Sequence, residues 1–445
     1  MTIGTTTSPG SDRPAGYRLL AAVGWLVFAV MLIRLIVFAQ APAPLPAIGW
    51  SVTPWNAFVT RHACTTAYWH AATEVERAPD VYAPSTYSTG RVGPDGREIP
   101  RFIGPYAVDP YEYPPTFLLL PRALTVVAAG FPQFRLLWGF MNLAVVIAAV
   151  ALVARRVDRE NGSRSLWLAP LALVPLTVFH VFQSGNAQLF FVALAMLAML
   201  AFERGRHAVG GLLLAYAIVG KLFPGLLVIY LAVRRDWRAL AWTAAWALGL
   251  TVVTVADIGW APFAAFLDHM PKLLSGEAFP MLRMQGPPDV SQSVPGLVLK
   301  LPRFGGPVLP FEALKIAGWI FSVVIVWATV RLALRPVSPR LAPLAWLVVL
   351  GLATLRSPFL PGYGAFQGVW VATILLALTW SDARRRALAL LLWAPLLWMT
   401  AGPPTLPPVV IATATTLQTI AILTLFGLAV RVGRAAAVQP TGAAA

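Results

Sequence analysis

The chain has 445 residues, of which 58% are hydrophobic and only 12% are charged, and its mean hydropathy is +0.71. These values lie far outside those of soluble globular domains, so they exclude an ordinary soluble enzyme and indicate a protein that crosses a membrane several times. The 34 basic and 18 acidic residues give a net charge of +16. The basic residues fall in short clusters between apolar stretches, as in the cytoplasmic loops of membrane proteins. The charge therefore predicts membrane topology, and no nucleic-acid partner.

The cysteine content and the motifs exclude several kinds of site and enzyme. Cys64 is the single cysteine of the sequence, so neither an intrachain disulfide framework nor a cysteine-based zinc site can form. The chain has no P-loop, no GxSxG and no HExxH. We therefore assign no metal ligand and no cofactor, although the sequence leaves metal dependence open.

The first predicted element is an uncleaved span at residues 19–39, which is preceded by Arg13 and Arg18 and is long enough to cross a bilayer. Further arginine clusters, expected to be cytoplasmic, separate the later apolar stretches. These clusters place further spans near residues 134–154, 165–182, 186–202, 238–257, 313–333, 341–355, 362–380, 385–400 and 408–429.

Two apolar regions do not fit a simple span. Residues 114–130 are interrupted by Pro121 and Arg122, and a crossing there would break the alternation of sides, so we predict a helix at the outer interface. The stretch 208–235 has cytoplasmic arginines at both ends. We therefore predict a hairpin of two short helices that turns at "GKLFP".

The predicted fold is an all-α polytopic membrane protein, with about ten spans plus the short hairpin in one integral membrane domain over residues 1–445. Its first outer loop covers 40–133 and carries juxtamembrane helices, and its second covers 258–311. Both loops contain acids, aromatic residues and prolines. Chemistry is expected in these loops, and the Ala-rich tail 435–445 is expected to be disordered.

Lys221 is the most informative single residue. An amine in an apolar segment is costly unless it faces a polar cavity or a counter-ion, so intramembrane lysines are candidate functional residues. Its position between Gly220 and Pro224 favours a lysine that points into a cavity where a phosphate binds, and the alternative is a lysine that extends to an interface. Arg356 has a similar setting at the outer end of a span, where a simple interfacial arginine is the alternative.

Five segments, in this order and spacing, resemble glycosyltransferase family 87. They read "YEYPPTFLLLPR", "SGNAQLFFVALAMLAML", "GGLLLAYAIVGKLFPGLLVIYLAVRRDWRAL", "DVSQSVPGLVLKL" and "RSPFLPGYG". The resemblance covers roughly residues 60–380 and implies a GT-C-fold membrane enzyme that uses polyprenyl-phosphate sugars, typically mannose. It further implies an outward-facing active site, a catalytic acid in the first outer loop, and inversion of stereochemistry.

One position departs from the family pattern. Members commonly have an aspartate a little before "AA…Y" in the first outer loop, and aligning "HAATEVERAPDVY" puts Cys64 there. A neutral thiol is a poor base. Either another acid has taken the role, or the activity is altered or absent; Asp109 is the preferred replacement, Glu112 the second and Asp80 the third, with a solvated loop acid as the alternative for each.

The expected chemistry assigns the remaining site residues. The acceptor hydroxyl needs a carboxylate to take its proton, and cations stabilise the charge that develops on the departing phosphate. Lys221 would contact this phosphate, with Arg356 or Arg283 in support. The residues expected to hydrogen-bond sugar hydroxyls are Asn186, Gln188, Gln292 and Ser293. Tyr113 and Tyr363 would stack on a sugar face.

The sequence thus predicts a glycosyltransferase of the plasma (inner) membrane whose active site lies on the outer face. It would move mannose or another hexose from a polyprenyl-phosphate donor to a glycan or glycolipid acceptor among the membrane lipids. Two alternatives stay open: a transporter or flippase of a lipid-linked saccharide, and a catalytically inactive lipid-sugar binder, which the cysteine at position 64 would suit.

Overall fold

A computed structural model describes residues 15–40, 49–56, 59–60, 64–93, 98–157, 164–284, 286–397 and 405–438. Most of these residues are helical, as expected. By length and composition, five described helices could cross a membrane. They are α1 (Ala15–Gln40), α7 (Phe131–Val157), α13 (Trp237–Ile258), α15 (Phe311–Ala333) and α19 (Pro408–Val438). A sixth span arises if α8 with η3 (Arg164–Ala172) and α9 (Leu176–Ser184), bent by 63°, are counted as one.

The expected count of about ten spans is not confirmed, because several predicted spans are short helices. They are α10 (Gln188–Glu203), α16 (Ala342–Leu355), α17 (Ala365–Thr379) and α18 (Ala383–Leu397). The two helices of the predicted hairpin, α11 (His207–Gly220) and α12 (Leu226–Val233), are short as expected. A helix of 14 to 16 residues is about 21–24 Å long, less than the ~30 Å of a hydrocarbon core. Nearly all residues of α10, α16 and α17 are buried, so these three helices form the core of the protein.

Glycines allow the last helix to pack closely on this core. A Cβ at Gly351 of α16 would lie 2.1 Å from the Phe426 ring, and one at Gly368 of α17 would lie 2.8 Å from Ile422. Small residues at such crossings let helix backbones approach each other. α19 continues to Val438, four residues into the stretch 435–445 that was expected to be disordered, and residues 439–445 lie outside the described part.

The helix break predicted at "GKLFP" is present. α11 ends at Gly220, Lys221 is extended, and the 3₁₀ helix η4 (Phe223–Gly225) leads into α12. Proline in the first turn of η4 supplies no backbone N–H to continue α11. The stretch 114–130, for which we predicted a helix at the outer interface, contains η1 (Pro115–Leu118) followed by α6 (Leu119–Val127).

The two loops that were predicted to lie outside contain more structure than expected. The first has α4 (Cys64–Glu74), α5 (Pro84–Tyr87) and two small antiparallel hairpins. The hairpins pair β1 (Ser88–Val92) with β2 (Glu98–Pro100) and β3 (Phe102–Ile103) with β4 (Tyr106–Ala107). The fold is therefore mostly helical rather than purely so. The second loop has α14 (Ala261–Ser275) and the 3₁₀ helices η5 (Pro280–Arg283), η6 (Pro287–Val290) and η7 (Pro295–Phe304).

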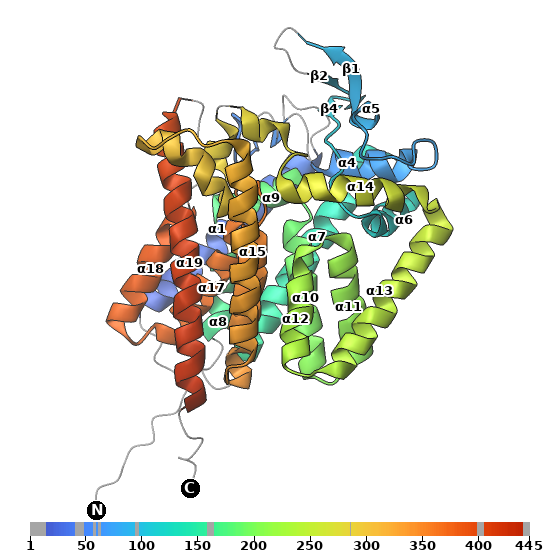
Figure 1. Cartoon of the computed structure of the whole chain (residues 1–445). Coiled ribbons are helices and arrows are strands. Elements are labelled where there is room, and N and C mark those ends of the chain that lie inside the picture. Colours follow the sequence, from blue (N-terminus) through green and yellow to red (C-terminus); the bar gives the residue numbers. More distant parts are fainter. Residues whose placement is uncertain are drawn as a thin grey trace, which may run out of the picture.

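The structured parts of both loops lie at the same end of the molecule, where α4, α6 and α14 pass close together above the helix bundle (Figure 1). The turns from α10 to α11 and from α12 to α13, which carry arginines, lie at the opposite end (Figure 1). This arrangement separates the acids of the two loops from the arginines of these two turns.

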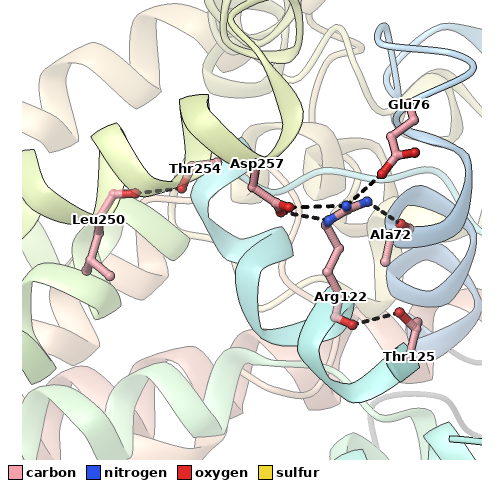
Figure 2. A network of polar contacts seen from close by, with 7 residues as sticks. All are labelled: Ala72, Glu76, Arg122, Thr125, Leu250, Thr254 and Asp257. Carbon is pink, nitrogen blue, oxygen red and sulfur yellow. Dashed lines mark hydrogen bonds and ion pairs between the residues drawn. The ribbon is translucent and has the colours of Figure 1, made fainter. Parts of the chain in front are cut away.

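Arg122 of α6 joins three elements at the loop end. Its guanidinium donates to both carboxylate oxygens of Asp257 at 2.7 and 3.2 Å, to Glu76 at 2.8 Å, and to the carbonyl of Ala72 at 3.1 Å (Figure 2). Asp257 belongs to α13, Ala72 to α4, and Glu76 follows α4. The Arg122 side chain is 21% exposed, so its bonds are only partly screened by solvent.

We predict that Arg122→Ala lowers the free energy of unfolding by about 1–3 kcal/mol, the cost of losing charge-assisted bonds at a half-buried site. Thermal unfolding of the purified protein in detergent measures the effect. Arg77→Ala is the matched control: its side chain is 80% exposed and pairs only with Glu74 of the same turn, so its unfolding temperature should stay near that of the wild type. Equal unfolding temperatures for both variants would contradict the prediction.

Candidate active site

Lys221 lies between two tyrosines that the sequence had also singled out. Its Nζ is 4.6 Å from the centre of the Tyr113 ring and 5.9 Å from that of the Tyr363 ring, and it donates to the Tyr113 hydroxyl at 3.4 Å. Aromatic faces attract a cation and partly replace its water. The three residues come from the helix break, the end of the first outer loop and the segment after α16, and the structure brings them together.

A hydrogen-bonded tyrosine pair fixes the first outer loop against the core. The Tyr68 hydroxyl of α4 donates to the Tyr113 hydroxyl at 2.9 Å and accepts from the backbone N–H of Ala187 at 3.1 Å. The two rings pack edge to face with their centres 5.2 Å apart. Gly185, in the turn between α9 and α10, has φ +71, and a Cβ there would lie 2.4 Å from Thr65 Cγ2. Glycine at this turn therefore allows α4 to approach.

Cys64 lies among the candidate residues. The Asn186 amide donates to its sulfur at 3.5 Å. The pKa of the thiol is raised to about 12: burial is the main cause and the Asp109 carboxylate adds to it, while Asn186 and the Lys221 ammonium act in the opposite direction. The charges of Asp109 and Lys221 thus act on the Cys64 thiol in opposite directions.

Asp109 is held beside α4 by its backbone. Its N–H donates to the Thr66 hydroxyl of α4 at 3.1 Å, which fixes the segment before Tyr113 beside that helix. The Asp109 side chain is half-buried. The carboxylate is therefore only partly shielded from water.

Glu112 turns toward the second outer loop. Its carboxylate lies 2.7 Å from Nε2 of His269 on α14, and the His269 ring stacks on Tyr82 with the ring centres 4.9 Å apart. Burial raises the pKa of Glu112, and the hydrogen bond and charge of His269 oppose this. Asp80 is exposed and accepts from the N–H of Tyr82 at 3.1 Å, which caps its own turn. The three candidate acids thus have three different environments.

The other predicted ligands make contacts that hold helices together. Gln188 donates to Thr354 at 3.0 Å, and Gln292 donates to Gln418 at 2.8 Å. Ser293 accepts from the N–H of Gly296 at 2.9 Å. None of these contacts joins them to Lys221.

The two predicted arginines also contact other elements. Arg356 donates to Ser322 of α15 and to the carbonyl of Leu274 in α14, each at 2.9 Å. The guanidinium of Arg283 lies over the Phe311 ring, 4.2 Å from its centre. Each arginine thus has its own partner in the outer part of the protein.

Two residues of the site were missed by the sequence reasoning. Tyr68 follows Cys64 by four residues in "CTTAYWH", and helical spacing would have placed it on the same face. His269 lies in "LDHMPK" and carries no sequence signal, because its partner Glu112 is 157 positions away.

We predict that Cys64 reacts slowly with iodoacetamide. With the pKa raised from 9.0 to about 12, the thiolate fraction at pH 8 falls by about 10³, and the thiolate is the reactive form. Mass spectrometry of the intact protein over pH 7–9 measures the rate. A cysteine at the exposed position Ser85 (Ser85→Cys) in a Cys64→Ser background is the control. Equal rates for the two cysteines at pH 8 would contradict the burial of the thiol.

The comparisons with known proteins bear on these residues. A 28% identical stretch of 174 residues is shared with the polyprenol-phosphate-mannose-dependent alpha-(1-2)-phosphatidylinositol mannoside mannosyltransferase of Mycobacterium tuberculosis (strain ATCC 25618 / H37Rv). This stretch covers 36% of this chain and 40% of the relative, so less than half of the relative's length is matched.

Among solved structures, ArnT from Cupriavidus metallidurans is similar over 93% of this chain and 79% of its own when bound to undecaprenyl phosphate. Without ligand it matches 92% and 77%. Sequence identity is 17% for both, and the TM-scores are 0.40 and 0.33.

The model of glycosyltransferase family 87 matches residues 111–358, which is more than half of the chain. The match includes Glu112, Tyr113, Lys221 and Arg356, and begins two residues after Asp109. The chain belongs to glycosyltransferase family 87.

Proposed function

We propose that this protein is a GT-C-type hexosyltransferase that moves mannose or another hexose from a polyprenyl-phosphate donor to a glycan or glycolipid acceptor. Family membership supports glycosyl transfer, and the mannosyltransferase relative supports a polyprenyl-phosphate donor. One geometric observation carries the proposal: the Lys221 ammonium at the helix break meets the rings of Tyr113 and Tyr363. Asp109 is held by its backbone against Thr66 of α4, the helix that begins at Cys64.

The two charges suit the two halves of the reaction. Asp109 takes the proton of the acceptor hydroxyl as its oxygen attacks the anomeric carbon of the sugar. The bond from that carbon to the phosphate oxygen breaks, and the polyprenyl phosphate leaves with the bonding electrons. Lys221 stabilises the charge that develops on this phosphate. Attack from the face opposite the leaving group inverts the configuration.

The surrounding side chains suit a sugar. Tyr113 and Tyr363 both present aromatic rings to the Lys221 amine, and aromatic faces pack well on the apolar side of a hexose. Asn186 lies against Cys64, where its amide supplies a hydrogen-bonding group for a sugar hydroxyl. Contacts of this kind orient the donor for attack.

The environments of the acids favour Asp109 as the base. Glu112 is engaged by His269 and faces α14, whereas Asp80 caps an exposed turn. Cys64 itself is protonated at neutral pH because burial raises its pKa to about 12, so the thiol takes no proton from the acceptor. Asp109 is a half-buried acid whose charge acts on the Cys64 thiol.

We further propose that the reaction takes place on the outer face of the plasma membrane. The support is the positive-inside distribution of arginines in the sequence, together with the separation of the loop acids from the arginine-bearing turns (Figure 1). A donor whose polyprenyl tail lies in the bilayer presents its phosphate at the membrane surface, which is the level at which the outer loops return to the bundle.

The first test concerns the donor phosphate. Lys221→Met should weaken binding of a polyprenyl phosphate by about 1.5–3 kcal/mol, the value of a hydrogen bond to a charged group. Titration of undecaprenyl phosphate into the purified protein measures the affinity. Lys272→Met, which removes an exposed lysine of α14, is the matched control and should bind as the wild type does. Normal affinity in a folded Lys221→Met protein would exclude this role.

The second test separates binding from transfer. Asp109→Asn should bind the donor normally but lose about 10²- to 10⁴-fold in transfer rate, the usual contribution of a general base, while Cys64→Ala stays active. Transfer from a panel of radiolabelled polyprenyl-phosphate sugars in liposomes measures the rate. If Asp109→Asn turns over normally and Glu112→Gln does not, Glu112 is the base. Binding of donor without transfer by the wild type, for every sugar and acceptor tried, would support an inactive lipid-sugar binder instead.

A further inference from the structure

Arg135 is a buried cation near the outer end of a membrane-spanning helix. It lies in the second turn of α7, and only 6% of its surface is exposed. Its guanidinium lies 4.7 Å from the centre of the Phe38 ring in α1 and 5.3 Å from that of Tyr106 in β4, and one terminal nitrogen donates to the Tyr106 hydroxyl at 3.2 Å. These contacts hold the arginine in place, but they supply no negative charge.

The charge of Arg135 has no anion in the described part of the chain. Its other terminal nitrogen, Nη2, is buried and has no hydrogen-bond partner, and no carboxylate of a described residue forms an ion pair with it. Burying an unpaired charge costs several kcal/mol, and ionisable groups within membrane spans are usually functional. The missing partner is therefore an anion that the protein binds.

An apolar groove reaches this arginine. It contains about 490 Å³ including its open mouth. α1, α7 and α9 form its walls, and most of its lining is aliphatic or aromatic. α1 is largely exposed along its length, so this side of the protein faces membrane lipid. The groove joins a lipid-facing surface to a buried cation.

A second polar atom lines the same groove. Thr65 is 1% exposed, and its hydroxyl has no hydrogen-bond partner among the residues that the structure describes. It follows Cys64 directly in α4, so the groove ends one residue from the proposed active site. Its hydroxyl and the Arg135 guanidinium are two donors that suit phosphate oxygens.

We propose that this groove binds the acceptor, and that the acceptor is a phosphate-bearing lipid. The hydrocarbon chain would lie along α1 and α7, and the phosphate would meet Arg135 and Thr65. The inference rests on the proposed function, in which Lys221 already holds the donor phosphate. A second phosphate site beside Cys64 then serves the other substrate, whose headgroup hydroxyl reaches Asp109.

Lipid binding to the full-length protein in detergent, measured by native mass spectrometry, tests the proposal. The probes are phosphatidylglycerol, the uncharged diacylglycerol, and undecaprenyl phosphate. Arg135→Gln should bind phosphatidylglycerol about tenfold more weakly than the wild type, as expected when a hydrogen bond to a charged group is lost. Its affinity for undecaprenyl phosphate should not change. Arg77→Gln, which removes an exposed loop arginine, is the control and should bind all three lipids as the wild type does.

A second variant probes the groove without removing the charge. Gly139 of α7 lines the groove, and a Cβ there meets no atom within 4 Å. Gly139→Leu should therefore fold and occupy part of the space, which should lower the affinity for both phosphatidylglycerol and diacylglycerol severalfold. If Arg135→Gln fails to fold, Gly139→Leu still tests whether the groove binds lipid.

The outcomes separate this inference from the proposed function. If Gly139→Leu, or a folded Arg135→Gln, binds phosphatidylglycerol with wild-type affinity, the proposal that the groove binds the acceptor is wrong. Loss of undecaprenyl phosphate binding alone would show that the groove holds the donor, and would overturn the acceptor assignment. Normal undecaprenyl phosphate binding by Lys221→Met, with phosphatidylglycerol binding lost in the groove variants, would remove the proposed donor site and leave the groove inference standing.

Discussion

The placement of one ammonium group at a helix break organises the loop end of this protein. A lysine inside a continuous apolar helix would leave its charge in hydrocarbon, which is costly. Here α11 ends at Gly220, so Lys221 leaves the helix and its amine meets the rings of Tyr113 and Tyr363. Tyr113 is in turn fixed by Tyr68, and Tyr68 by the backbone at Ala187. The first outer loop is thus tied to the core at the point where the charge emerges.

The sequence predicted the elements of this site better than their assembly. The break at Lys221 followed from the arginines at both ends of the stretch 208–235, because one straight span would have placed them on opposite sides of the membrane. Helix positions followed from apolar stretches between arginines. However, Tyr113 and Lys221 are 108 positions apart, and no local sequence pattern predicts a contact between them. For the same reason, the sequence did not predict the contact between Glu112 and His269.

The number of spans and the small strands are two further features for which prediction from the sequence was limited. Hydropathy marks α10, α16 and α17 as apolar segments, but it does not distinguish a short helix surrounded by protein from one that crosses lipid, since both are apolar all round. The hairpin of β1 and β2 had a signal in "GPDG", residues 93–96, because Asp-Gly is a common hairpin turn. We predicted no strands there, because the composition of the chain indicated helices alone.

The contact between Glu112 and His269 couples the two outer loops. Glu112 lies three residues after Asp109 on the same extended segment, and His269 lies on α14. α14 cannot move away from the first loop without either breaking this contact or drawing the segment with it. The position of α14 and the placement of the Asp109 carboxylate are therefore mechanically linked. Any ligand that displaced α14 would also shift the segment that carries Asp109.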